Sequence, residues 1–414
     1  MAEVFSCGLA EHRKKVQEEN NKEIVYTDNL ARYFAKISHS KPRPQIKKEE
    51  TDENGFWIRQ PNLLTTPFGA KDGELKADKD RYIIYWARTC NWSNRPVIVR
   101  DLLGLQDVIK DYIVGQTGES NEYGWGFPRE WDFKDPNTGV YFLSDLYLNT
   151  KPDFTGRATT PTIADYKEKK AVNNDYHRMT NYLEVQFRKY QKVDAPDLYP
   201  VKYRKEIDEF NDWLFPNIND GHYRMAFATS PEGYKDGHRA FHAGLEKLDK
   251  RLETNRFLFG DYITDSDVRV YVSLIKWELD FYVNVGPQVK RITEYKNVWE
   301  YIKELYSIPE FKRYTNFPKL DDNPIIKFGT YLTRIAPKIN WDEELKTDHS
   351  RKALSADPEN IFLKHPKGES VEDYQTEINQ THWNSLDFNV RKNKDFKLSV
   401  DASINPLKGK LKNE

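Results

Sequence analysis

The chain contains very little cysteine. Among its 414 residues only Cys7 and Cys90 carry a thiol, and there is no CxxC pair. This scarcity excludes a disulfide framework and a cysteine-rich metal site, and it favours a reducing, cytoplasmic compartment. The nine histidines also lack the shared spacing of a metal site, so we expect no metal cofactor.

A long apolar run is missing as well. No stretch approaches the length of a transmembrane helix, and the opening residues, MAEVFSCGLAEHRKK, lack the apolar core of a secretory signal. An excess of one charge is also absent, because 64 basic and 65 acidic residues give a net charge of −1. We therefore expect a soluble protein that binds neither nucleic acid nor a membrane, and we interpret the basic runs KPRPQIKK and KGKLK as solvated tails.

Aromatic residues, in contrast, are abundant. They make up 14% of the chain, with 25 tyrosines and 10 tryptophans, which is typical of cores and pockets built from large rings. The length exceeds that of one ordinary hydrophobic core, so we expect two domains with extensions.

Residues 81–103, RYIIYWARTCNWSNRPVIVRDLL, are the stretch around which the chain is organised. A β-branched and aromatic run predicts a buried strand over 81–88, and apolar spacing predicts a helix over 92–103. Cys90 then lies at a strand-to-helix turn, where the first N–H groups of a helix favour a thiolate, and Arg95 would add a positive neighbour. The alternative interpretation of Cys90 is that it is a small, buried residue of the core, because many lone cysteines are.

The segments around this stretch indicate the fold. A second strand is expected near 107–114, a short strand broken by Pro161 over 158–165, and a helix over 177–187. From residue 197 the apolar spacing becomes helical, and Thr264 to Asp267 form a helix-capping box. The expected architecture is α/β plus all-α. It divides into an N-terminal arm over 1–55, a thioredoxin-like domain over 56–192 with an insertion at about 116–157, an all-helical domain over 193–340 and an irregular extension over 341–414.

A series of motifs along the chain resembles that of the glutathione transferases. Within that family the resemblance is to the Xi class, the glutathionyl-hydroquinone reductases. The resemblance covers about residues 55–318. The motifs are CNWSNR at 90–95, GWGF at 124–127, LSDLY at 143–147, FTGR at 154–157, TP at 160–161, VNN at 172–174, DLYP at 197–200, and the longer stretches 207–230, 257–277 and 308–317.

The resemblance implies a thiol reaction. Cys90 would take the glutathionyl group from a glutathionyl-hydroquinone as a mixed disulfide, and a second thiol would release it. Pro161 would be a cis-proline beside the thiol, Arg157 would meet a carboxylate, and Tyr199 would face the electrophile. The implied catalytic residues are Cys90 and Tyr199. The residues implied to bind glutathione are Trp92, Trp125, Arg157, Thr160, Pro161, Val172, Asp175 and Tyr176.

Glutathione would be the co-substrate and an aromatic or quinone-type compound the second substrate, in a homodimer. The chain departs from the family pattern at its site. Asn91 stands where the family has Pro, Ser93 where it has Ala, and Asp175-Tyr176 where it has a Glu-Ser pair. A late tyrosine pair is missing, and Tyr331 is the nearest substitute. Two alternatives therefore stay open: a scaffold that has lost glutathione binding, and an enzyme that uses another low-molecular-weight thiol.

Overall fold

The computed structural model describes residues 32–38, 40, 50–116, 123–128, 131–278, 285, 290–315, 340–349 and 351–367, and the backbone of 325–328 and 332–335. Cys7 and Tyr331 lie outside these ranges. A four-stranded sheet in the order β2-β1-β5-β6 forms the centre of the first half. β1 pairs in parallel with β2 and antiparallel with β5, and β5 pairs antiparallel with β6. The strands are β1 (Tyr82–Trp86), β2 (Lys110–Ile113), β5 (Thr162–Asp165) and β6 (Lys170–Asn173).

The alternation of side chains along β1 supplies two cores. Tyr82, Ile84 and Trp86 belong to the larger core with helix α2 (Asn91–Leu102). Ile83 and Tyr85 belong to a second core on the opposite face of the sheet. Because successive strand residues point to opposite faces, one buried strand serves both layers.

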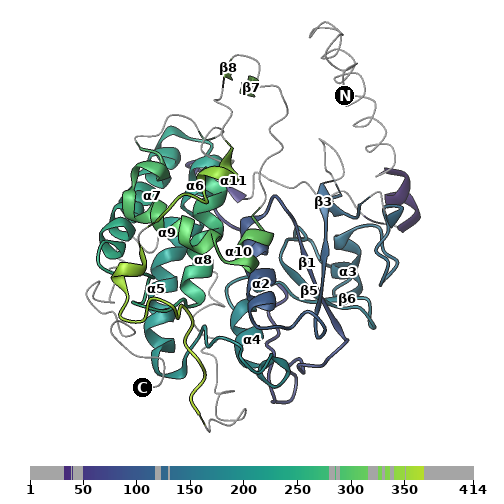
Figure 1. The fold of residues 1–414 in the computed structure, drawn as a ribbon. Helices are drawn as coiled ribbons and strands as arrows, with labels where there is room; N and C mark the ends of the chain where they lie inside the picture. The colour runs from purple at the N-terminus through teal and green to yellow at the C-terminus, as the bar shows by residue number, and fades with distance from the viewer. Residues whose placement is uncertain are drawn as a thin grey trace, which may run out of the picture.

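Helix α3 (Leu143–Thr150) lies within the segment expected to be an insertion at 116–157. Leu143, Leu146 and Tyr147 are fully buried in the second core, and the helix packs on β6. Part of this segment is therefore integral to the sheet domain. Sequence periodicity missed the helix because Gly, Pro and Asp residues surround it. With α2 and α4 (Met179–Val185) on the other face, the arrangement is thioredoxin-like (Figure 1).

The second half is a bundle of helices beside the sheet domain (Figure 1). A short π-helical segment, Phe215–Asn219, continues α5 and leads toward α6. The predicted start of α8 at Thr264 is confirmed, because the N–H and the hydroxyl of this N-cap residue both donate to Oδ2 of Asp267, at 2.8 and 2.9 Å. The helices are α5 (Arg204–Leu214), α6 (Gly221–Ala226), α7 (Pro231–Leu252), α8 (Asp265–Lys276), α9 (Lys296–Tyr306) and α10 (Pro309–Arg313).

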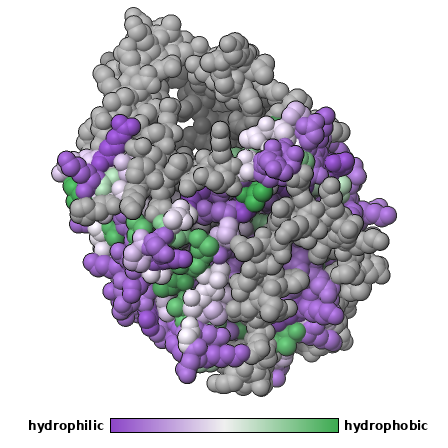
Figure 2. Space-filling model, turned by 180° about the vertical axis from the view of Figure 1, so that it is seen from behind, coloured by the Kyte–Doolittle hydropathy of each residue, from purple (hydrophilic) through white to green (hydrophobic). Residues whose placement is uncertain are grey.

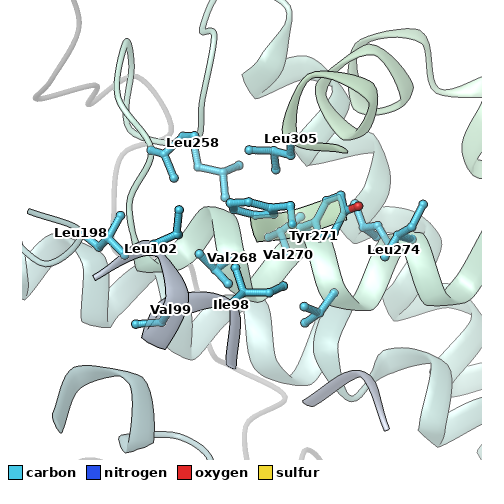
Figure 3. Packing of buried hydrophobic residues seen from close by; sticks show 14 of the residues in the cluster. Ile98, Val99, Leu102, Leu198, Leu258, Val268, Val270, Tyr271, Leu274 and Leu305 are labelled. Carbon is cyan, nitrogen blue, oxygen red and sulfur yellow. The ribbon is translucent and has the colours of Figure 1, made fainter. Parts of the chain in front are cut away.

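Helix α2 joins the two halves because it packs against α8. Figure 3 shows Ile98, Val99 and Leu102 of α2 beside Val268 and other apolar residues of α8. These side chains are almost completely buried. The helix that begins next to Cys90 is therefore anchored in the largest hydrophobic core of the described chain.

The chain after the bundle contains more regular structure than expected. A β-hairpin of β7 (Ile325–Phe328) and β8 (Leu332–Ile335) lies within the range predicted to be all-helical. The extension then contains the short helix α11 (Trp341–Glu344) and a 3-10 turn, Arg351–Leu354. The extension is also tied to the body, because the N–H groups of Asp197 and Ile263 donate to carbonyls of Leu363 and Ile361.

The described surface in Figure 2 is mainly hydrophilic, with separate hydrophobic areas. The helices of the described ranges are too short or too polar to cross a bilayer.

Candidate active site

Cys90 is the N-cap residue of α2 and has an extended backbone, so its side chain stands at the start of the helix. Its thiol is partly exposed and donates a weak hydrogen bond to the carbonyl oxygen of Thr160, 3.5 Å away. The peptide bond between Thr160 and Pro161 is cis, as the resemblance implies. Cys90, at the turn from β1 to α2, and Thr160, just before β5, therefore lie side by side although 70 positions separate them.

Ser93 holds the turn that presents the thiol. Its hydroxyl accepts a hydrogen bond from the N–H of Ala87 at 3.0 Å and lies 2.8 Å from the carbonyl oxygen of Cys90. Ser93 is completely buried, so its replacement of the family's Ala adds hydrogen bonds beneath the turn. The departure therefore adds side-chain hydrogen bonds to the turn that carries Cys90.

Two arginines, Arg59 and Arg157, flank the thiol. Arg59 Nη1 lies 3.3 Å from Oε1 of Glu50, and Arg157 Nη2 lies 2.8 Å from the same atom. Burial lowers the pKa of Arg157, as does Arg59, while Glu50 and Cys90 oppose that shift. The pKa of Arg59 is lowered by burial but raised on balance by Tyr176, Glu50 and other nearby negative groups. Both guanidiniums therefore lie close enough to Cys90 to interact with it electrostatically.

Arg95 does not take the role expected for it. Its side chain is buried, and burial followed by the charge of Arg269 lowers its pKa to about 9. The negative groups that act on it are Asp265, Glu184 and Asp175. The positive neighbours of Cys90 are instead Arg59 and Arg157, because helical geometry turns Arg95 toward the interior.

An aromatic wall stands beside Cys90. The Trp92 ring stacks on Tyr176 with centroids 4.7 Å apart, and it also contacts Phe215 at 5.5 Å and Tyr223 at 4.8 Å. The Trp92 indole N–H donates to the carbonyl oxygen of Asn219 at 3.0 Å. Residues predicted from two separate motifs, Trp92 and Tyr176, are thus brought together against the helical half.

Asn91, which replaces the family's Pro, links the wall to the helical half. Its Oδ1 accepts a hydrogen bond of 2.7 Å from the Tyr223 hydroxyl, and its Nδ2 lies 3.4 Å from Nε2 of His222. Burial lowers the pKa of His222 to about 3, so this imidazole is neutral. Burial, and after it the charge of Cys90, raises the pKa of Tyr223, so its phenol is a proton donor at neutral pH.

Asp175 and Tyr176 differ in their surroundings. Asp175 is 2% exposed, and its Oδ1 accepts the backbone N–H of His177 at 3.2 Å. Burial raises its pKa to about 6, although Arg178 opposes the shift. Tyr176, in the position of a family serine, is 4% exposed because its ring fills the space beside Trp92. The Asp175 carboxylate therefore retains its charge at neutral pH, whereas the serine hydroxyl has been replaced by a ring.

Three predicted binding residues have buried polar atoms that no described residue satisfies. They are Nε1 of Trp125, Nε of Arg157 and Oγ1 of Thr160. Buried donors and acceptors nearly always have partners, and the exceptions often belong to ligand sites. An indole N–H, a guanidinium N–H and a hydroxyl are groups that can hydrogen-bond the carbonyl oxygens of a peptide-like ligand. Val172 lies in β6 and is only partly buried.

Tyr199 lies in a different network. Its hydroxyl donates to Oδ1 of Asp208 at 2.7 Å and accepts from Arg178 at 3.2 Å, and its ring lies beneath the guanidinium of Arg204. The side chain is 1% exposed. Tyr199 is therefore part of a buried polar network with Asp208 and Arg178, in which the two side chains also bond to each other at 3.1 Å.

Sequence reasoning missed Glu50, Arg59 and Tyr223. Glu50 lies in the segment expected to be an N-terminal arm, and Arg59 lies ahead of the first predicted strand, so neither belongs to a stretch with a periodic signal. Tyr223 lies within the family-like stretch 207–230 and was one of several unassigned aromatic residues there. Over the described ranges there is also no cluster of three His, Cys, Asp or Glu side chains that would hold a metal ion.

Comparisons with known proteins agree with this geometry. Residues 231–304 match the family model for the glutathione S-transferase C-terminal domain. The chain is 30% identical to the glutathione S-transferase omega-like 2 of Schizosaccharomyces pombe, over 64% of this chain and 87% of that protein. It is also 30% identical to the glutathionyl-hydroquinone reductase YqjG of Escherichia coli, over 59% of this chain and 74% of that protein.

Solved structures show the same relationship. The glutathione-bound structure of Escherichia coli YqjG superposes with a TM-score of 0.60 and 28% identity, covering 72% of this chain and 97% of that one. The Xi transferase of Phanerochaete chrysosporium gives a TM-score of 0.61 and 29% identity, covering 64% of this chain and 87% of that one. The thiol turn, the cis-proline, the two-part fold and these relatives show that the chain is an enzyme of the glutathione S-transferase family, related to its Xi class and to the glutathionyl-hydroquinone reductases.

Proposed function

We propose that the protein is a cysteine-dependent reductase that removes a thiol group from glutathionyl-hydroquinone-type adducts through Cys90. The observation that carries the proposal is the position of the Cys90 thiol. It stands at the N-terminus of α2, bonded to the Thr160 carbonyl and flanked by Arg59 and Arg157. Reactive cysteines in enzymes are commonly found at helix N-termini and beside positive side chains.

The reaction has two steps. The Cys90 thiolate attacks the sulfur of the adduct, so an S–S bond forms, the bond between sulfur and the ring carbon breaks, and the electron pair stays on that carbon. A proton completes the hydroquinone, and the Tyr223 hydroxyl, 2.7 Å from Asn91 Oδ1, is the proposed donor. A second thiol molecule then attacks the mixed disulfide, which leaves a free disulfide and restores Cys90.

The aromatic wall supports an aromatic second substrate. Tyr223 is the partly exposed ring of the wall beside the thiol, and the buried Trp92 packs against it and against Tyr176. Aromatic rings stack favourably on one another, by about 0.5–1.5 kcal/mol beyond the effect of burial. A planar hydroquinone or naphthohydroquinone matches this surface.

The test is turnover of a menadione–glutathione adduct, with detection of the Cys90 mixed disulfide by mass spectrometry. Cys90→Ser is expected to abolish both signals, and Cys7→Ser, the matched control, is expected to retain them. Full activity in Cys90→Ser would show that the nucleophile is another group. Calorimetric titration tests the alternative of a scaffold that has lost its co-substrate, since such a protein would bind no small thiol.

Three further points belong to the same proposal. The division into 1–55, 56–192, 193–340 and 341–414 can be tested by limited proteolysis. The expected homodimer can be tested by sedimentation. A cytoplasmic location can be tested by cell fractionation.

A further inference from the structure

We propose that Glu50 determines the thiol specificity of this enzyme. Its carboxylate holds Arg157 in place of a carboxylate of the co-substrate, so the site accepts a thiol that lacks a free carboxylate at this position. The inference rests on the proposed function and deepens it, because it names the class of thiol. It concerns a residue of the N-terminal segment that neither the motifs nor the resemblance singled out.

Glu50 contacts the two arginines in the way that a carboxylate of a bound ligand would. Nη2 of Arg157 lies 2.8 Å from Oε1 and 3.1 Å from Oε2, and Nη1 of Arg59 lies 3.3 Å from Oε1. Glu50 is 4% exposed, and the Arg157 side chain is 14% exposed. Charge-assisted hydrogen bonds of this kind are among the strong interactions that proteins use to recognise carboxylates.

A small hairpin holds Glu50 in this position. Its carbonyl accepts the N–H of Ile58 at 2.7 Å, and Thr51 pairs with Trp57 across the turn. The Trp57 indole donates to Asp220 at 3.2 Å, which ties the hairpin to the start of α6. Glu50 is therefore fixed by backbone pairing and by a contact with the helical half.

The same segment also fixes Arg157. Gln60 accepts the Arg157 N–H at 3.0 Å and donates to the Arg157 carbonyl at 2.8 Å. The two hydrogen bonds clamp the backbone of Arg157 beside the segment that carries Glu50. The pairing of the two side chains is thus built in from both ends.

The charges near the thiol determine which ligands the site accepts. The Glu50 carboxylate already contacts both guanidiniums, and Asp220 adds a further negative charge that acts on Arg59. A carboxylate of the co-substrate would add negative charge that neither arginine is left to compensate, and a buried uncompensated charge is unfavourable. An ester or amide at that position adds no charge and still accepts a hydrogen bond, for which Arg157 has the buried Nε without a partner among the described residues.

The first test uses the unmodified enzyme. Menadione adducts of glutathione and of glutathione diethyl ester, in which both carboxylates are blocked, are compared by kcat/KM. We expect kcat/KM for the ester adduct to equal or exceed that for the glutathione adduct, to within about threefold. A preference of about tenfold or more for free glutathione would overturn the proposal.

The second test changes the carboxylate. Glu50→Gln is expected to shift the ratio of the two kcat/KM values toward the glutathione adduct by about tenfold. The reason is that the Arg157 guanidinium becomes available to a carboxylate of the ligand. In the double variant that also carries Arg157→Gln, this shift in the kcat/KM ratio should disappear. Glu304→Gln is the matched control, since Glu304 is also about 4% exposed and lies 2.6 Å from Arg256 and 3.8 Å from Arg351. An equal shift in both variants, or none in Glu50→Gln, would contradict the assignment.

Calorimetry separates this inference from the proposed function. If no adduct is turned over by any variant, the proposed function fails. The affinity for glutathione itself then decides the role of Glu50: tighter binding to Glu50→Gln than to the unmodified protein supports it, and equal binding refutes it. Should Glu50→Gln not fold, the comparison of the two adducts with the unmodified enzyme remains decisive.

Discussion

The Tyr223 hydroxyl donates a hydrogen bond of 2.7 Å to Oδ1 of Asn91, the residue that follows Cys90. The two residues are 132 positions apart, one at the start of α2 and the other in α6. The bond connects the thiol turn of the sheet domain to the helical half. It gives Asn91, which stands where the family has a Pro, a hydrogen-bond partner from the helical half beside Cys90.

The first prediction concerns this phenol. Tyr223→Phe removes the proposed proton donor but retains the ring that packs against Trp92. We expect kcat for a menadione adduct to fall by about 100-fold, with KM little changed, because general acid catalysis contributes at least this much. The rate at which iodoacetamide alkylates Cys90 serves as the reference for an intact thiol. An unchanged kcat would remove Tyr223 from the mechanism.

The second prediction concerns Tyr199. Tyr199→Phe leaves Asp208 and Arg178 without a shared hydroxyl partner in a buried network. We expect the free energy of unfolding to fall by about 1–3 kcal/mol, with kcat unchanged in enzyme that remains folded. Denaturant titration and steady-state kinetics measure the two effects. A large loss of kcat without loss of stability would support the catalytic role that the resemblance implies for Tyr199.

The third prediction concerns the aromatic wall. Tyr176→Ala removes a buried ring that stacks on Trp92 and lies 5.8 Å from Phe215. We expect the free energy of unfolding to fall by about 3–5 kcal/mol, as for other buried aromatic side chains. Tyr176→Phe, the control, keeps the ring and should cost less than about 1 kcal/mol. Similar losses in both variants would mean that the hydroxyl, rather than the ring, stabilises the wall.

The fourth prediction is a pH dependence that arises from Asp175. Burial raises its folded pKa to about 6, whereas an unfolded aspartate has a pKa of about 3.9. Between these values the unfolded chain binds fewer protons than the folded one, so the free energy of unfolding falls as pH rises. The difference of about two pKa units corresponds to about 3 kcal/mol.

Comparison of the unmodified protein with Asp175→Asn isolates this contribution. The variant should gain stability relative to the unmodified protein as pH rises from about 4 to 6, and the difference should be constant at higher pH. Asp175→Glu, which keeps an ionisable group, should retain most of the dependence. A stability difference between Asp175→Asn and the unmodified protein that does not change with pH would contradict the buried, ionised carboxylate described above.

The local structure around Cys90 could be predicted from the sequence. The alternation in β1 and the apolar spacing of α2 are local patterns, and they locate the thiol at a strand-to-helix turn to within about two residues. The capping box of α8 was readable for the same reason, since its two residues lie within one turn. Helix α3 was not readable, because glycine- and proline-rich segments hide a short helix whose stability comes from packing on β6.

What surrounds the thiol was decided only by the tertiary structure. Glu50 meets Arg157 across 107 positions, and Tyr223 meets Asn91 across 132. Hydrophobic periodicity reports which face of an element is buried, but it carries no information about which distant charge or hydroxyl that face will meet. The sequence by itself therefore determined a thiol at the end of a helix in a transferase scaffold. Folding determined that Arg59 and Arg157, rather than Arg95, are its positive neighbours, because α2 turns Arg95 into the interior, where Asp265, Glu184 and Asp175 are the negative groups that act on it.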